Sequence, residues 1–164
     1  MEKIAKKFME VFSGLDRAHG VYEITGQKTT AKGVKKDGRG RTLQEPLTLD
    51  LWVRHLKGEV SIGVIPLKDD ETCQWGCIDV DEYPIDTKAL LATIKDMSLP
   101  LVPCMTKSGG VHLFLFTKVP IPAFKIQGKL EEIAASMGRT GDEIADGLVP
   151  GSVCFKFYNP GYQE

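Results

Sequence analysis

The stretch Trp75–Asp86, WGCIDVDEYPID, begins as an apolar run of the kind found in buried β-strands and ends among acidic residues. Asp79 and Asp81 interrupt the run two positions apart, with only Val80 between them. Burying a carboxylate is costly unless something offsets its charge. No Lys or Arg occurs between Asp69 and Asp86. The fold must therefore supply another partner for these two acids.

The segments after this strand follow a known order. Apolar spacing predicts strands at 73–80, 99–106, 111–118 and 152–158, and helices at 86–97 and 121–138. The order β-α-β-β-α-β is that of ferredoxin-like and RNA-recognition folds. We therefore predict an α/β (α+β) chain, one domain over residues 1–164, with this core at 68–164 and an N-terminal α/β extension at 1–67.

The N-terminal extension contains apolar and basic segments in turn. Residues 1–12 predict a helix, because the apolar residues Ile4, Phe8, Val11 and Phe12 have a helical spacing. A short strand is expected around 21–24, a mobile loop or loose hairpin at 27–41, a second helix at 45–58 and a strand at 60–67. Gly58 is placed to end the second helix.

The predicted topology brings the two aspartates next to a histidine. The first and third strands of this fold are antiparallel neighbours, so the end of strand 73–80 lies beside the start of strand 111–118. Since side chains alternate along a strand, Asp79, Asp81 and His112 share the face that the helices leave free. The segment GDEIADG reaches the same edge and offers Asp142, Glu143 or Asp146 as a third carboxylate. Such a cluster suits hard divalent cations, which serve phosphoryl transfer in pairs.

The turn before His112 lies at the same edge. Gly109 and Gly110 let the backbone approach a ligand closely, their amides can bind phosphate, and Lys107 adds positive charge. Taken alone, this segment favours a plain hairpin turn, and a lone histidine is more often structural. Its convergence with the acids favours the functional interpretation.

Composition and charge exclude several classes of protein. The 21 basic and 22 acidic residues nearly cancel, but one segment is strongly basic and would attract polyanions, with Asp37 its only acid: Lys28, Lys32, Lys35, Lys36, Arg39 and Arg41. No apolar run is long enough to span a bilayer and no signal peptide is evident, so we expect a cytoplasmic protein with no membrane partner. The four cysteines lack zinc-ligand spacing and predict buried core residues: Cys73, Cys77, Cys104 and Cys154.

These motifs resemble the catalytic core of the archaeo-eukaryotic primase superfamily, the prim-pol enzymes, and most of all its phage, mobile-element and TOTE conflict system members. Asp79 and Asp81 match the acid-x-acid of the first motif, and Ser108, Gly109, Gly110 and His112 match the Ser/Gly-rich turn of the second. Glu143 followed by Ile144 matches the start of the third motif, whose Phe-Pro-Lys-Gln continuation this chain lacks.

The resemblance implies a primase-polymerase that joins NTPs or dNTPs on a single-stranded DNA template. Two Mg²⁺ or Mn²⁺ ions would bind Asp79, Asp81 and Glu143, and no zinc is expected. The incoming nucleotide would contact Lys107, Ser108, Gly109, Gly110, His112 and Arg17, while the basic segment would hold the nucleic-acid backbone. A bacterial, phage or mobile-element source, with a helicase domain or another replication partner, fits the same resemblance.

Two other functions use the same residues. A non-catalytic RNA-recognition module would stack bases on Phe114 and Phe116 of the open sheet face. Two acids on that face would repel phosphate unless metal were bound, which disfavours the module. A metal-dependent nuclease would use the same carboxylates, and only the match to the primase motifs argues against it.

Overall fold

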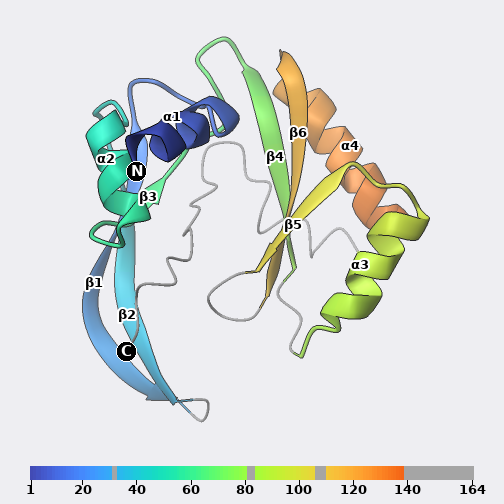
Figure 1. The fold of residues 1–164 in the computed structure, drawn as a ribbon, viewed down its shortest axis with the longest axis horizontal. Coiled ribbons are helices and arrows are strands. Elements are labelled where there is room, and N and C mark those ends of the chain that lie inside the picture. Colours follow the sequence, from blue (N-terminus) through green and yellow to red (C-terminus); the bar gives the residue numbers. More distant parts are fainter. Residues whose placement is uncertain (31–32, 81–83, 106–109, 139–164) are drawn as a thin grey trace.

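A computed structural model describes residues 1–30, 33–80, 84–105 and 110–138 (Figure 1). In chain order the elements are α1 (Glu2–Val11), β1 (His19–Thr30), β2 (Gly33–Leu43), α2 (Leu49–Leu56), β3 (Ile62–Gly63), β4 (Thr72–Val80), α3 (Thr87–Asp96), β5 (Leu101–Met105), β6 (Val111–Pro122) and α4 (Ala123–Ser136). The strands form two antiparallel sheets of three, ordered β2-β1-β3 and β4-β6-β5. The prediction of a mixed α/β chain is confirmed.

The second sheet has the strand neighbours that the sequence predicts. β6 lies between β4 and β5 and runs antiparallel to both, so the first and third predicted strands of the core are adjacent. The fourth predicted strand, residues 152–158, lies outside the described residues. The described part therefore contains the β-α-β-β-α portion of the expected order, and the complete RNA-recognition topology stays a prediction.

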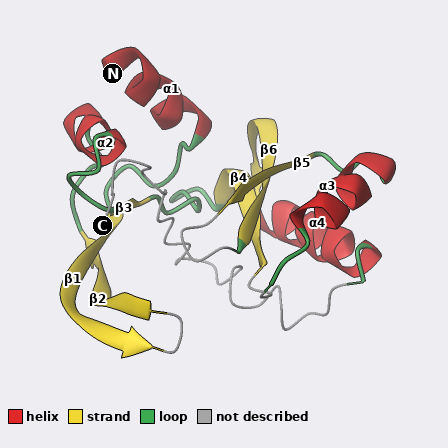
Figure 2. Ribbon diagram, turned by 60° about the horizontal axis from the view of Figure 1, so that its bottom comes forward, coloured by secondary structure: helices red, strands yellow, loops and turns green. Residues whose placement is uncertain are grey.

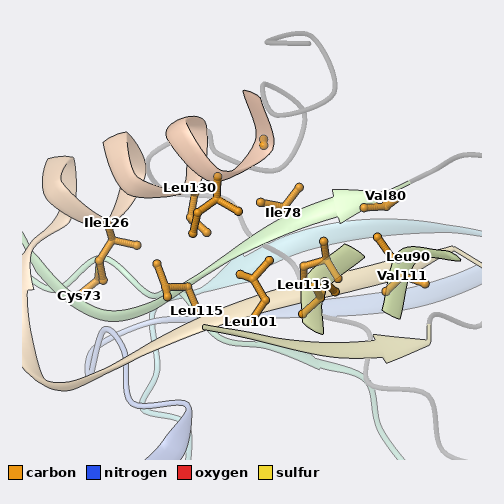
Figure 3. Close-up of a cluster of buried hydrophobic side chains, with 13 residues drawn as sticks. Cys73, Ile78, Val80, Leu90, Leu101, Val111, Leu113, Leu115, Ile126 and Leu130 are labelled. Atoms are coloured by element: carbon orange, nitrogen blue, oxygen red, sulfur yellow. The ribbon is translucent and has the colours of Figure 1, made fainter. Parts of the chain in front are cut away.

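Helices α3 and α4 cover one face of this sheet with an aliphatic core (Figures 1 and 3). Ile78 and Val80 of β4 and Leu113 of β6 are almost fully buried there. The helices contribute Leu90, Ile94, Ile126, Leu130 and Ile133 to the same cluster. Burial of each such side chain contributes about 1.5–3 kcal/mol. The prediction that Ile78 and Val80 face the helices is confirmed.

Local sequence signals fix the helix ends. The Asp86 side chain accepts hydrogen bonds from the amides of Lys88 and Ala89 and so caps α3. Thr48 caps α2 by accepting from the amide of Leu51. Gly58 and Gly138 follow α2 and α4 with φ angles of 81° and 74°, a conformation that glycine adopts without steric cost.

An irregularity in the pairing of β4 with β6 changes which face the side chains of β4 occupy. The β4–β6 register runs Cys73↔Ile121 and then Trp75↔Phe116, so extra residues of β6 oppose Gln74. In this region the Thr117 hydroxyl oxygen lies 3.0 Å from the carbonyl oxygen of Gln74 and 2.8 Å from that of Val119, and it donates its one proton to either of them. As a result Cys73 belongs to the aliphatic cluster, whereas Trp75 belongs to a second cluster on the other face.

The second cluster shows that this other face is not open along its whole length. Phe12 and Trp52 come from the N-terminal extension and pack with Trp75 and Phe114 of the sheet. The Trp75 indole also donates a 2.9 Å hydrogen bond to the carbonyl of Ser13. Helices α3 and α4 do leave this face uncovered, as predicted, but the N-terminal segments cover the part of it that contains Trp75, Cys77 and Phe114.

Only some of the apolar residues of α1 are buried. Ala5 and Phe12 are buried and Phe8 packs against their cluster, whereas Ile4 and Val11 are 51% and 47% exposed. The helix ends at Val11. Phe12 follows it directly and packs edge-on against Trp75. The predicted helix is confirmed. Its buried face is set by the aromatic partners available in the sheet and does not include Ile4 and Val11.

The basic segment is part of a long hairpin. β1 and β2 pair from His19↔Leu43 to Thr30↔Gly33, so of the two sequence predictions for this segment the hairpin is confirmed. β3 pairs with β1 only at Gly20 and Val21, and it is two residues long where a strand over 60–67 was expected. Within the part of the chain that the structure describes, every helix is too short or too polar to cross a bilayer.

At Gly76, helix α4 packs closely against the sheet. A Cβ atom at Gly76 would lie 2.7 Å from both Ile126 Cγ2 and Leu130 Cδ1. We expect Gly76→Val to lower the free energy of unfolding by about 1–3 kcal/mol through overpacking, as measured by denaturant titration. Gly128 is the control, because a Cβ there meets nothing within 4 Å. Gly128→Ala should stabilise the protein, and equal behaviour of the two variants would contradict this packing.

Candidate metal- and nucleotide-binding site

Asp79 and His112 form the centre of the site. They are directly opposed residues of β4 and β6, next to the pair Val80↔Val111 at the end of the ladder. His112 Nε2 lies 3.4 Å from Asp79 Oδ1. The Asp79 side chain is 38% exposed although its Oδ1 atom is buried. The carboxylate therefore lies where the covered part of the sheet face meets solvent.

Cys77 and His112 are neighbours of Asp79 on this sheet face. On the same face, two residues earlier in β4, Cys77 is buried. Its burial, followed by the negative charge of Asp79, raises the pKa of the Cys77 thiol well above its ordinary value. Cys77 therefore stays protonated at neutral pH and adds no charge beside Asp79. The His112 ring packs edge-on against Phe114, with centroids 5.9 Å apart.

The remaining predicted ligands fall mostly outside the described residues. Asp81, Lys107, Ser108, Gly109 and the three candidate third acids Asp142, Glu143 and Asp146 are among them, so their roles stay predictions. Gly110 is described and buried immediately before β6. Among residues 1–30, 33–80, 84–105 and 110–138, no three His, Cys, Asp or Glu side chains lie close enough together to hold one ion.

Asp79 is nevertheless suited to binding a divalent metal ion. A carboxylate oxygen is the type of ligand that Mg²⁺ and Mn²⁺ prefer. The described position supplies one such group at a strand end, partly open to solvent. Asp81 follows it by two residues in the sequence.

Arg17 is held by an acidic partner. Its Nε and Nη2 atoms donate to the Asp69 carboxylate at 3.0 and 2.8 Å, and Nη1 donates to Gln44 at 3.4 Å. The hydrogen bonds and then the charge of Asp69 raise the pKa of the Arg17 guanidinium above its ordinary value. Both side chains of the pair are largely exposed. A nucleotide phosphate at Arg17 would have to compete with Asp69.

The predicted nucleic-acid-binding residues lie on the β1–β2 hairpin. Lys28 is in β1, and Lys35, Lys36, Arg39 and Arg41 are in β2. Arg39 and Arg41 are exposed, and Arg41 forms an ion pair with Glu23. Lys32 lies outside the described residues.

Cys104 lies on the same sheet face as Asp79 and His112, although the sequence predicted it to be a buried core residue. It is exposed and directly opposes His112 across the β5–β6 ladder, so Asp79, His112 and Cys104 form one row over three strands. The prediction of buried cysteines is confirmed for Cys73 and Cys77 and wrong for Cys104, while Cys154 lies outside the described residues.

Strand pairing explains the error. The prediction depended on the apolar, strand-like context of Cys104, which does not fix the register of the strand. The observed register pairs Met105 with Val111. A shift of one residue exchanges the two faces of a strand.

Most of the chain matches a single protein family. Residues 6–145 match the family described as the TOTE conflict system, Archaeo-Eukaryotic Primase domain. No curated protein matches the chain.

The exposure of Cys104 predicts selective labelling. In a Cys154→Ser background, a thiol-specific alkylating reagent should modify Cys104 in the native protein and reach Cys73 and Cys77 only after unfolding. Partial burial raises the pKa of Cys104, and the thiolate is the reactive form. Labelling should therefore keep accelerating with pH beyond the point at which a free cysteine levels off. Mass spectrometry identifies the modified residue, and modification of Cys77 in the native state would contradict the described sheet.

Proposed function

Because the chain belongs to the archaeo-eukaryotic primase family of TOTE conflict systems, we propose that it is a metal-dependent primase-polymerase. Membership of this family implies nucleotidyl transfer, with nucleic acid and nucleotides as substrates. The finer proposal is that it joins NTPs or dNTPs on a single-stranded DNA template. A cytoplasmic location in a bacterium, or in a host of a phage or mobile element, and cooperation with a helicase belong to the same proposal.

The observation that supports this proposal is the pairing of Asp79 with His112. The first acid of the acid-x-acid motif and the histidine of the Ser-Gly-Gly-x-His motif come from segments more than thirty residues apart. They are nevertheless directly opposed, with Nε2 and Oδ1 separated by 3.4 Å. One residue from each of two motifs that would act on one substrate therefore lies on the same sheet face.

Asp79, Asp81 and Glu143 are the residues proposed to hold divalent ions. Bound Mg²⁺ or Mn²⁺ would activate the attacking 3′-hydroxyl and stabilise negative charge on the leaving pyrophosphate. The role of Asp79 is to provide an anionic oxygen at a fixed position. The ladder pairs Asp79 with His112 and Val80 with Val111, and this pairing restricts the movement of the strand end.

His112 is proposed to bind the incoming triphosphate together with Lys107, Ser108, Gly109 and Gly110. Its Nε2 atom lies near the Asp79 carboxylate, and its ring packs against Phe114. These two contacts limit the rotation of the imidazole. The histidine would thus be oriented before substrate arrives, which lowers the entropy lost on binding.

The RNA-recognition alternative loses its main support. Base stacking in such modules requires aromatic faces that are open to the ligand. Phe114 is only 2% exposed and packs edge-on against Phe12 at 5.4 Å and stacks with Phe116 at 5.8 Å. A nuclease that uses the same acids remains the second candidate, because its metal ligands would be identical.

Primer synthesis with acid variants is the test of the proposed function. The protein is incubated with single-stranded DNA, labelled NTPs or dNTPs, and Mg²⁺ or Mn²⁺, and products are resolved by length. We expect template-dependent products that Asp79→Ala and Asp81→Ala abolish, because each removes a carboxylate that would hold metal. Asp96→Asn, at an exposed position in the last turn of α3, is the matched control and should retain activity.

The other outcomes discriminate between the functions. Shortened template in place of extended product would identify a nuclease. Binding without any synthesis would support a non-catalytic module. Synthesis that survives Asp79→Ala would show that the metal site is assigned to the wrong residue.

The Arg17–Asp69 pair provides a separate test of nucleotide binding. If Arg17 contacts the triphosphate, Asp69→Asn should raise nucleotide affinity severalfold, because it releases the guanidinium from its competing carboxylate. Titration with a fluorescent nucleotide measures this change. Glu71→Gln removes the same charge two residues away and is the control. A gain that persists in the Arg17→Ala, Asp69→Asn double variant would exclude Arg17 as its cause.

A further inference from the structure

The β1–β2 ribbon, residues 19–30 and 33–43, extends beyond the rest of its sheet (Figures 1 and 2). Within the described residues a third strand joins it only at Gly20 and Val21. Beyond Val21 the two strands continue pairing to Thr30↔Gly33, a length of roughly 30 Å. An isolated two-stranded ribbon is marginally stable in water. Since no third strand among the described residues pairs with the ribbon beyond Val21, a binding partner would stabilise it.

The charge pattern of the ribbon indicates a polyanion as that partner. Lys28 and Lys35 occupy directly opposed positions, and Gln27 opposes Lys36. Like charges directly opposite each other destabilise a strand pair. Near the base of the ribbon, Arg39 and Arg41 are exposed, with Glu23 paired to Arg41. Phosphate groups along the ribbon would supply negative charge next to these opposed basic positions.

The shape of the ribbon favours a groove of double-stranded DNA over a single strand. Proteins that hold single strands stack bases on aromatic side chains. In the described ribbon the only Phe, Tyr or Trp is Tyr22, and its ring occupies the space where a Cβ of Gly38 would lie, with Cε1 at 2.4 Å. Stacking platforms therefore do not line this surface.

The glycines keep the ribbon thin. A Cβ added at Gly26 or Gly40 would meet no atom within 4 Å, and neither residue has a left-handed φ angle. Packing and backbone conformation therefore do not require glycine at these positions, although glycine weakens a strand. A two-stranded ribbon fits the major groove of B-form DNA, which is about 12 Å wide. The major groove of A-form RNA is too narrow and deep for such entry.

We propose that the β1–β2 ribbon binds double-stranded DNA by entering its major groove, with Lys28, Lys35 and the neighbouring basic residues at the phosphates. The duplex would be DNA on one side of the site of synthesis. This inference deepens the proposed function by naming the form of nucleic acid that the basic segment binds.

Equilibrium binding without nucleotide or divalent metal tests the ribbon. Fluorescence anisotropy compares a DNA duplex, one of its single strands, and an RNA duplex of the same sequence. We expect the DNA duplex to bind most tightly. The Lys28→Ala, Lys35→Ala double variant should weaken duplex binding and reduce the slope of log affinity against log salt by about two. Lys88→Ala, Lys95→Ala removes two exposed lysines from α3 and should change neither.

A variant that leaves charge unchanged tests groove entry itself. Gly40→Phe adds bulk to the ribbon and should weaken binding of duplex DNA, while Gly128→Phe on the exposed side of α4 should not. Circular dichroism verifies that both variants fold.

Three results would overturn the proposal: equal binding of the RNA duplex, tighter binding of the single strand, or equal effects of the two lysine pairs. Because no synthesis takes place in this assay, failure of the metal site would not produce any of them. Conversely, the ribbon inference would stand if Asp79→Ala proved harmless to synthesis.

Discussion

The register of the β4–β6 ladder is the constraint on which the rest of the structure depends. It puts Ile78, Val80 and Leu113 into the aliphatic core and leaves Asp79 and His112 on the opposite face. A slip of one residue would move the Asp79 carboxylate into the core beneath α4, where no charge could be offset. The hydrophobic demand of one face therefore fixes the position of the polar pair on the other.

The N-terminal extension determines how much of that polar face remains accessible. Phe12 and Trp52 bury Trp75, Cys77 and Phe114, and the aromatic cluster ends near the row that contains Asp79 and His112. The site is thus bounded by a hydrophobic wall on one side and by the end of the ladder on the other. Burial of Asp79 Oδ1 is consistent with this boundary position. A low local dielectric strengthens any charge interaction made there.

The β1–β2 ribbon and the core sheet separate charges of opposite sign. Basic residues lie along the ribbon, whereas Asp79 lies near the end of β4 and further acids follow it in the sequence. Duplex DNA could be held by the ribbon without direct repulsion by the carboxylates of the core sheet. Divalent ions at the acids would then attract the triphosphate of the nucleotide. The division of labour that we propose follows from this separation.

Periodicity alone determined much of the outcome for this protein. The order of the elements predicted the meeting of Asp79 with His112. The alternation in 73–80 and 111–118, the helical spacing after Asp86 and Pro122, and the glycines at 58 and 138 predicted the helices and strands themselves. These features are local, because they depend on side-chain alternation and capping. Residues 139–164 and the turn 106–109 lie outside the described residues, so the third carboxylate and the phosphate-binding turn stay predictions.

Only the tertiary structure decided three other features. It buried Phe114 under Phe12, exposed Cys104 beside His112, and turned the basic segment into a paired ribbon. Each depends on which distant segment packs against a residue or on a register that shifts faces with a single residue. The sequence carries those choices only through the total free energy of the fold, and no local pattern of residues reports them.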